Sequence, residues 1–205
     1  AYLGLRPIAA AYAEARQYVD EALAIDPNYG RGHDGLASIA LYYDRDLKVA
    51  AREWRRALQL DPGNAIIVSN SASLLDALGR HDESIAVGRY AVSRDPLNPL
   101  NHAQLGWSYY FAGRLDESAE AFRTASKLSS GHMEAGLGIS LTRLLAGDGQ
   151  GALDEAAKET SEMFRLWGQA LAYHALGKQA ESDNALEELI QKYEKNRPVA
   201  VASVY

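Results

Sequence analysis

The chain has 205 residues, of which 47% are apolar, and its formal net charge is −6. That acidic balance argues against a nucleic-acid partner, which usually needs a basic stripe, and the longest apolar runs fall short of the roughly 20 residues that span a bilayer. The absence of cysteine excludes disulfides and thiolate chemistry, and it leaves a periplasmic location open beside the cytoplasmic one that we expect.

Three Asp-Pro pairs punctuate the predicted elements along the chain. Each pair follows an Ala-led helical run, and their prolines, Pro27, Pro62 and Pro96, lie 35 and 34 residues apart. Because proline cannot continue a helix and disfavours the helical region in the residue before it, each pair is expected to end a helix. The same 34-residue interval separates three glycines: Gly79, Gly113 and Gly147. Columns that agree on one period indicate repeated units.

The repeated units cover the whole sequence, so we expect a single domain of residues 1–205. Two partial units enclose five full ones, with the bounds 1–27, 28–62, 63–96, 97–130, 131–163, 164–195 and 196–205. The phase of the unit at 131–163 stays open, because Gly147 keeps the strict period whereas Leu137-Gly138 favours a shifted first helix with a longer turn. Since the chain opens without Met and stops inside an apolar run, we expect a piece of a longer protein.

The unit at 97–130 gives the clearest pattern of two helices. Its first helix is predicted from about Leu100 to Ala112, with Asn98 as N-cap, Pro99 in the first turn and Gly113 as the left-handed residue that ends it. The inner face of its second helix is formed by residues at helical spacing: Ala119, Phe122, Ala125 and Ser126.

A 34-residue helix–turn–helix unit of this composition resembles the tetratricopeptide repeat. The unit at 97–130 carries the family pattern in Leu105, Gly106, Tyr109, Gly113, Ser118, Phe122 and Ala125. The unit at 28–62 carries it with one extra residue in its "YYDRD" turn, and small residues such as Ser84 and Gly88 lead us to expect looser packing in the unit at 63–96. The resemblance implies an all-α, right-handed superhelical solenoid of antiparallel helix pairs, with about six repeats and truncated ends.

The titratable residues form no catalytic or metal-binding pattern. The five histidines make no His/Glu pair at ligand spacing on one helix, so exposed or cap-adjacent histidines are the simpler interpretation. The "GDGQG" segment (147–151) has the glycines of a phosphate loop but lacks the preceding strand and the following Lys-Ser/Thr. We therefore expect no enzyme activity, no metal and no cofactor in this chain.

One known binding mode of the family can be tested on the sequence. Some tetratricopeptide domains hold the C-terminal carboxylate of chaperones in a clamp of Lys, Asn and Arg on successive first helices. The matching positions here hold Asp34, Ser38, Asn70, Leu100 and Gln104. Only Asn70 is compatible, and Asp34 would repel a carboxylate where the clamp needs Lys, so chaperone-tail binding is rejected.

The resemblance also implies which side chains face the concave groove where these arrays bind partners. Ten residues are the candidate partner-binding set: Arg31, Asp34, Leu41, Tyr42, Ile66, Asp76, Leu100, Trp107, Tyr110 and Phe111. Three of them are aromatic and belong to one helix, and aromatic anchors are typical of interaction hot spots. The alternative is that these rings pack against the next repeat. The two aspartates favour a partner with a basic residue beside an apolar one.

These observations favour a protein-interaction module over an enzyme. Segments such as "LGWSYYFAGRLDES" (105–118) are similar to the repeat arrays of bacterial adenylate or guanylate cyclases, which implies a regulatory region of a larger signalling protein. A free-standing adaptor and the sensor region of a winged-helix transcriptional regulator are the alternatives. We also expect homodimers through exposed ends, formed by Tyr2, Leu3, Leu5, Val199, Val201, Val204 and Tyr205.

Overall fold

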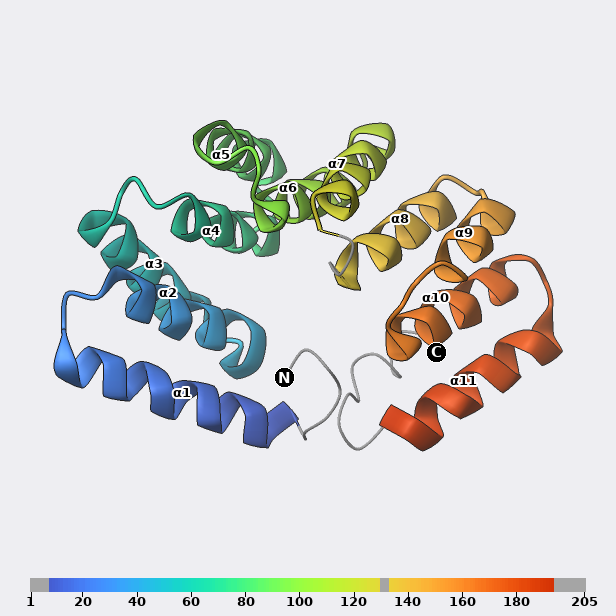
Figure 1. Cartoon of the computed structure of the whole chain (residues 1–205), viewed down its shortest axis with the longest axis horizontal. Coiled ribbons are helices and arrows are strands. Elements are labelled where there is room, and N and C mark those ends of the chain that lie inside the picture. The colour runs from blue at the N-terminus through green and yellow to red at the C-terminus, as the bar shows by residue number, and fades with distance from the viewer. Residues whose placement is uncertain (1–7, 130–132, 194–205) are drawn as a thin grey trace. The chain divides into compact units, whose positions relative to one another are not determined.

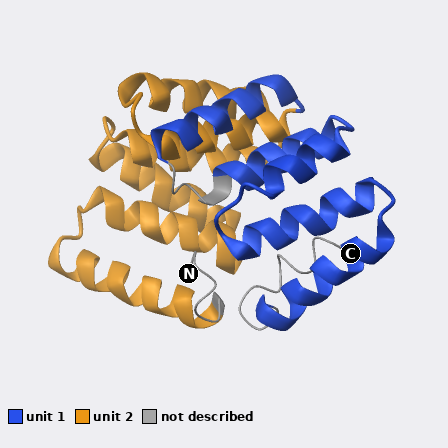
Figure 2. Ribbon diagram, turned by 45° about the vertical axis from the view of Figure 1, so that its right-hand side comes forward, with its two compact units in different colours: residues 1–8, 113–205 blue, residues 9–112 orange. Residues whose placement is uncertain are grey.

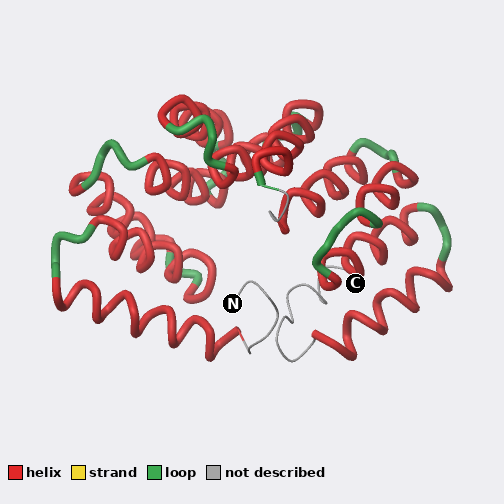
Figure 3. Tube along the Cα trace, viewed as in Figure 1, coloured by secondary structure: helices red, strands yellow, loops and turns green. Residues whose placement is uncertain are grey.

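The computed structural model describes residues 8–129 and 133–193, and in these ranges every regular element is helical (Figures 1 and 3). The elements are α1 (Ile8–Ile25), α2 (Gly30–Ile39), the π-helical turn η1 (Ala40–Asp44), α3 (Leu47–Leu60), α4 (Ala65–Ala77), α5 (His81–Arg94), α6 (Pro99–Phe111), α7 (Leu115–Leu128), α8 (Met133–Leu145), α9 (Gly149–Ala156), α10 (Glu162–Ala175) and α11 (Gln179–Tyr193). The all-α prediction is confirmed.

Helix ends fall where the sequence pattern places them. α1, α3 and α5 each stop one residue before an Asp-Pro pair. Asn98 caps α6 by accepting a hydrogen bond from the backbone N–H of Leu100 at 3.1 Å, and Asn64 caps α4 in the same way. Later turns contain a glycine with positive φ, in which the left-handed conformation costs no Cβ clash: Gly79, Gly113, Gly147 and Gly177.

Two compact units divide the chain, one formed by residues 9–112 and the other by the described residues from 113 onward (Figure 2). In the first unit, α2 packs on α3, α4 on α5, and α4 and α5 on α6. Its core includes Ala37, Ala40, Leu41, Ala50 and Trp54. In the second unit, consecutive helices from α7 to α11 pack on one another around Leu137, Met163, Phe164, Leu166 and Leu189.

The repeat at 63–96 is packed closely where looser packing was expected. Ser84 is fully buried, and its hydroxyl donates to the carbonyl of Ala72 at 3.1 Å and lies 2.7 Å from the hydroxyl of Ser108. A Cβ at Gly88 would lie only 3.1 Å from Leu105. The expectation was wrong at these positions because small residues let the helices approach and a buried hydroxyl bridges them.

The extra residue of the "YYDRD" segment is absorbed by winding. The chain leaves α2 in the π-helical turn η1, and the turn closes with Arg45 in the left-handed region at φ 59°. π-Helical turns inside α-helices carry one extra residue without breaking the helix.

The repeat at 131–163 uses both features that left its phase open. Gly147 forms the turn between α8 and α9 at φ 78°. Gly138 lies on α8, where a Cβ would meet the ring of Phe122 at 2.6 Å. The helix therefore begins early and the turn keeps the strict period, and the following α9 has only eight residues.

Candidate interaction surface

The three aromatic rings of α6 form one cluster. Trp107, Tyr110 and Phe111 stand at helical spacings of three and four, which places them on one face. Their ring centroids lie 5.6 Å apart for Trp107 and Tyr110, 6.2 Å for Trp107 and Phe111, and 5.5 Å for Tyr110 and Phe111. Phe111 is 52% exposed, and burial raises the pKa of Tyr110. A half-exposed apolar ring supported by two others is suited to contact a partner.

Other predicted surface residues lie at α2, η1, α4 and α6. Tyr42 is half-exposed, and its hydroxyl donates to Ser73 on α4 at 2.8 Å. Leu100 at the start of α6 is half-exposed, whereas Arg31 and Ile66 are partly buried. The structure therefore leaves Tyr42, Leu100 and Phe111 as the most accessible members of the predicted set.

Asp34 is buried inside the unit, with 3% of its surface exposed. The indole Nε1 of Trp54 donates to its carboxylate at 2.9 Å, Asn70 Nδ2 at 3.0 Å and Arg31 Nη1 at 3.0 Å. Burial raises the pKa of Asp34, and these donors oppose that shift. The carboxylate thus joins α2, α3 and α4, and a partner cannot reach it without displacing them.

Asp76 and Leu41 are also taken up by the fold. The Asp76 side chain is 5% exposed, accepts from the hydroxyl of Ser108 at 3.1 Å, and lies 3.6 Å from Nδ1 of His81. Burial raises its pKa. Leu41 is 6% exposed and belongs to the core. The expected negative charge of the partner-facing surface is therefore absent at Asp34 and Asp76.

The sequence interpretation missed the polar residues that hold these carboxylates. Asn70 donates to Asp34, and Ser108 donates to Asp76 from the next repeat. Their one sequence signal is a polar residue on an otherwise apolar helix face. Asn70 was the one residue compatible with a chaperone clamp, and its amide is committed to Asp34.

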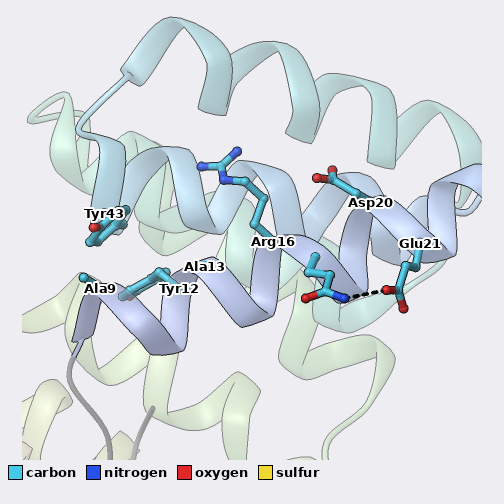
Figure 4. A pocket seen from close by; sticks show the side chains of 8 residues that line it. Ala9, Tyr12, Ala13, Arg16, Asp20, Glu21 and Tyr43 are labelled. Carbon is cyan, nitrogen blue, oxygen red and sulfur yellow. Dashed lines mark hydrogen bonds between the residues drawn. The ribbon is translucent and has the colours of Figure 1, made fainter.

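A shallow pocket of about 450 Å³ lies between α1 and η1 (Figure 4). It is lined by Ala9, Tyr12, Ala13, Arg16, Gln17, Asp20, Glu21 and Tyr43. The rings of Tyr12 and Tyr43 stack with centroids 4.8 Å apart, Arg16 pairs with Asp44 at 2.5 Å, and Gln17 donates to Glu21 at 2.8 Å. These groups hold one another and form no nucleophile–base pair.

Metal binding and membrane insertion find no support in the residues that the structure describes. Across 8–129 and 133–193, no three His, Asp or Glu side chains gather as a metal ion would require. In the same ranges no helix is both long and apolar enough to cross a bilayer. The residues expected to form sticky ends, such as Tyr2 and Val204, lie outside the described ranges.

Comparisons with known proteins place the sequence among repeat proteins. A family model described as "Tetratricopeptide repeat" matches residues 36–99 and 104–162, more than half of the chain. The "Small glutamine-rich tetratricopeptide repeat-containing protein 2" of Mycosarcoma maydis is 25% identical over 115 residues, 55% of this chain and 33% of that protein. A protein of the same name from Saccharomyces cerevisiae is 28% identical over 80 residues, 39% of this chain and 23% of that protein. The chain thus spans a third or less of these relatives.

Solved structures share the fold. PilW, a type IV pilus biogenesis factor, superposes with a TM-score of 0.70 at 22% identity, over 94% of this chain and 90% of that one. A thermophilic repeat protein of Thermus thermophilus gives a TM-score of 0.75 at 17% identity, over 85% of this chain and 98% of that one. Identities at this level show a common architecture alone, and that architecture is the predicted helical-repeat solenoid.

Proposed function

Because the chain belongs to the tetratricopeptide repeat family, a family of non-catalytic scaffolds that bind protein partners, we propose that its partner surface is centred on α6. The observation that carries the proposal is the cluster of Trp107, Tyr110 and Phe111, in which Phe111 is half-exposed. Leu100 and Tyr42 extend the accessible apolar surface. The partner segment inserts an apolar side chain beside Phe111 and needs no basic residue, since Asp34 and Asp76 are buried.

The test compares Phe111→Ala with Tyr90→Ala. Tyr90 is 50% exposed on α5 and lies outside the α6 cluster, so it is a matched aromatic control. Proteins captured from native extract by the wild type are identified, and their dissociation constants are measured by calorimetry. We expect Phe111→Ala to weaken binding about 30-fold, the equivalent of about 2 kcal/mol for a hot-spot ring, and Tyr90→Ala to leave it unchanged. Equal binding by both folded variants would disprove the α6 surface.

The wider role that we propose is the regulatory array of a larger bacterial signalling protein of the adenylate or guanylate cyclase class. The support is the resemblance of segments such as 105–118 to the arrays of those enzymes. The second candidate is a free-standing adaptor, which the names of the curated relatives favour. The sensor region of a winged-helix regulator is a third. The full-length gene decides: a cyclase or winged-helix domain in the same reading frame supports the first or the third, and its absence supports the adaptor.

Location and self-association remain proposals within this role. A cytoplasmic site of action fits a signalling array, and a periplasmic one fits an adaptor, so fractionation of native cells separates them. Homodimers through the chain ends would appear in light scattering as a concentration-dependent rise in mass. A monomer at high concentration would contradict them.

A further inference from the structure

The outer face of α3 carries a basic stripe, defined here as Lys48, Arg52, Arg55 and Arg56 (α3 is labelled in Figure 1). All four side chains are exposed, whereas Ala50, Trp54 and Ala57 on the opposite face are buried. Steps of four, three and one along a helix keep four residues on one side. The stripe is about 12 Å long, from the rise of 1.5 Å per residue.

The stripe is electrostatically unfavourable for the isolated helix. Like charges at spacings of three and four repel, as Lys48 with Arg52 and Arg52 with Arg55 do. Lys48 also lies in the first turn, where the helix dipole already places positive charge. The N-cap Asp46 lies there too, and it accepts the backbone N–H groups of Lys48 and Val49.

Two of the four charges are not compensated within the fold. Arg52 pairs with Glu53 at 2.7 Å and Arg56 donates to Asn28 at 2.5 Å. Lys48 and Arg55 have no ion pair with any described residue. A chain of net charge −6 thus keeps two unpaired cations on one exposed helix face.

The surroundings of the stripe select a short anion over an extended one. Asp44 and Asp46 precede it and Asp61 follows it, all within about a Debye length at physiological salt. A nucleic-acid strand or an anionic membrane extends past both ends and meets these carboxylates and the acidic remainder of the chain. A peptide carboxylate pairs with the arginine fork without that repulsion.

We propose that the basic stripe of α3 binds a short acidic segment of another polypeptide, with Glu or Asp side chains at helical spacing. This surface is separate from the α6 cluster and adds a second contact of opposite chemistry, polar where α6 is aromatic. The proposal does not depend on α6, so a protein with Phe111→Ala keeps it.

The test uses a fluorescent twelve-residue peptide with four glutamates at positions 1, 5, 8 and 12, and the same peptide with glutamine at those positions. Binding is measured by fluorescence anisotropy at low and high salt. The variant Lys48→Gln/Arg55→Gln removes the two unpaired charges and breaks no hydrogen bond of the described structure. The control Arg94→Gln/Lys127→Gln removes the same charge from exposed ends of α5 and α7. Circular dichroism checks that each variant is folded.

We expect the glutamate peptide to bind wild type, to lose affinity with added salt, and to bind Lys48→Gln/Arg55→Gln about tenfold more weakly, as two exposed ion pairs imply. The control binds like wild type. Equal binding of both peptides, or of both double variants, would overturn the proposal. So would tighter binding of a twelve-nucleotide single strand or phosphatidylserine vesicles, or self-association of wild type that Lys48→Gln/Arg55→Gln abolishes, since each names another occupant.

Discussion

Single residues decide how the helices of the first unit are joined. A buried carboxylate is costly unless donors surround it, and Asp34 receives Trp54 from α3, Asn70 from α4 and Arg31 from its own helix. His33, its neighbour, lies 2.8 Å from Glu53 through Nδ1 and 3.1 Å from the carbonyl of Pro27 through Nε2. Two adjacent residues thus tie α2 to three other segments.

Glu53 makes the stability of the first unit depend on pH. Burial raises the pKa of Glu53, but hydrogen bonds from His33 and Arg52, with their charges, outweigh burial and place the pKa below its ordinary 4.5. A depressed pKa stabilises the fold above 4.5, and this stabilisation is lost as pH falls through the folded-state value.

We expect Glu53→Gln to lower the free energy of unfolding by about 1–2 kcal/mol at neutral pH, as the loss of charged hydrogen bonds implies. The difference from wild type should shrink below pH 4.5. Urea titrations followed by circular dichroism at neutral and acidic pH measure it. Glu120→Gln, at an exposed pair with Arg123, serves as control and should show no such convergence. A difference that stays constant with pH would contradict the assignment to Glu53.

At the scale of elements, one turn departs from the others. Four turns use glycine at φ between 69° and 78°, whereas the turn after η1 places Arg45 at φ 59°. A side chain in the left-handed region costs about 1–2 kcal/mol. This cost is a consequence of the extra residue, which moves the turn onto an arginine.

We expect Arg45→Gly to raise the free energy of unfolding by about 0.5–1 kcal/mol, because relief of the left-handed strain exceeds the greater freedom of glycine in the unfolded chain. Thermal and urea unfolding measure the change. The reverse substitution, Gly79→Ala, should cost about 1 kcal/mol. A destabilised Arg45→Gly would show that contacts of the arginine outweigh its backbone strain.

Much of the element pattern was predictable from the sequence, because helix ends depend on local residues. Asn98, Gly113 and the Asp-Pro pairs act where they stand, and the structure uses them as expected. The candidate surface was less predictable. The repeat position of Asp34 implies a groove-facing side chain, but its burial depends on Trp54 and Asn70, 20 and 36 residues away. Repeat spacing carries no information about such long-range hydrogen bonds.

At the scale of the molecule, each of the two compact units has its own apolar core. Trp54 lies in the core of one and Trp167 packs against the core of the other, so each unit has an intrinsic fluorescent reporter. In repeat arrays each element contacts mainly its neighbours, and damage is expected to remain local. The single-domain prediction for residues 1–205 can therefore be tested by unfolding.

We expect Leu189→Ala, at a fully buried position of α11, to cost about 2–5 kcal/mol in the transition reported by Trp167. The transition reported by Trp54 should shift less. Two proteins that retain one of these tryptophans each, with the other tryptophans changed to phenylalanine, allow separate urea titrations. Coincident shifts would show that the array unfolds as one cooperative domain.

The π-helical turn η1 has a consequence for how such a protein can diverge. A gained residue at the end of α2 changes the winding of one turn, and Ala37 and Ala50 on either side keep their buried positions. An insertion of this kind can therefore survive in a lineage without compensating changes in the neighbouring repeats. Unit length at this turn is free to vary between related proteins, while the packing alanines that flank it hold the alignment.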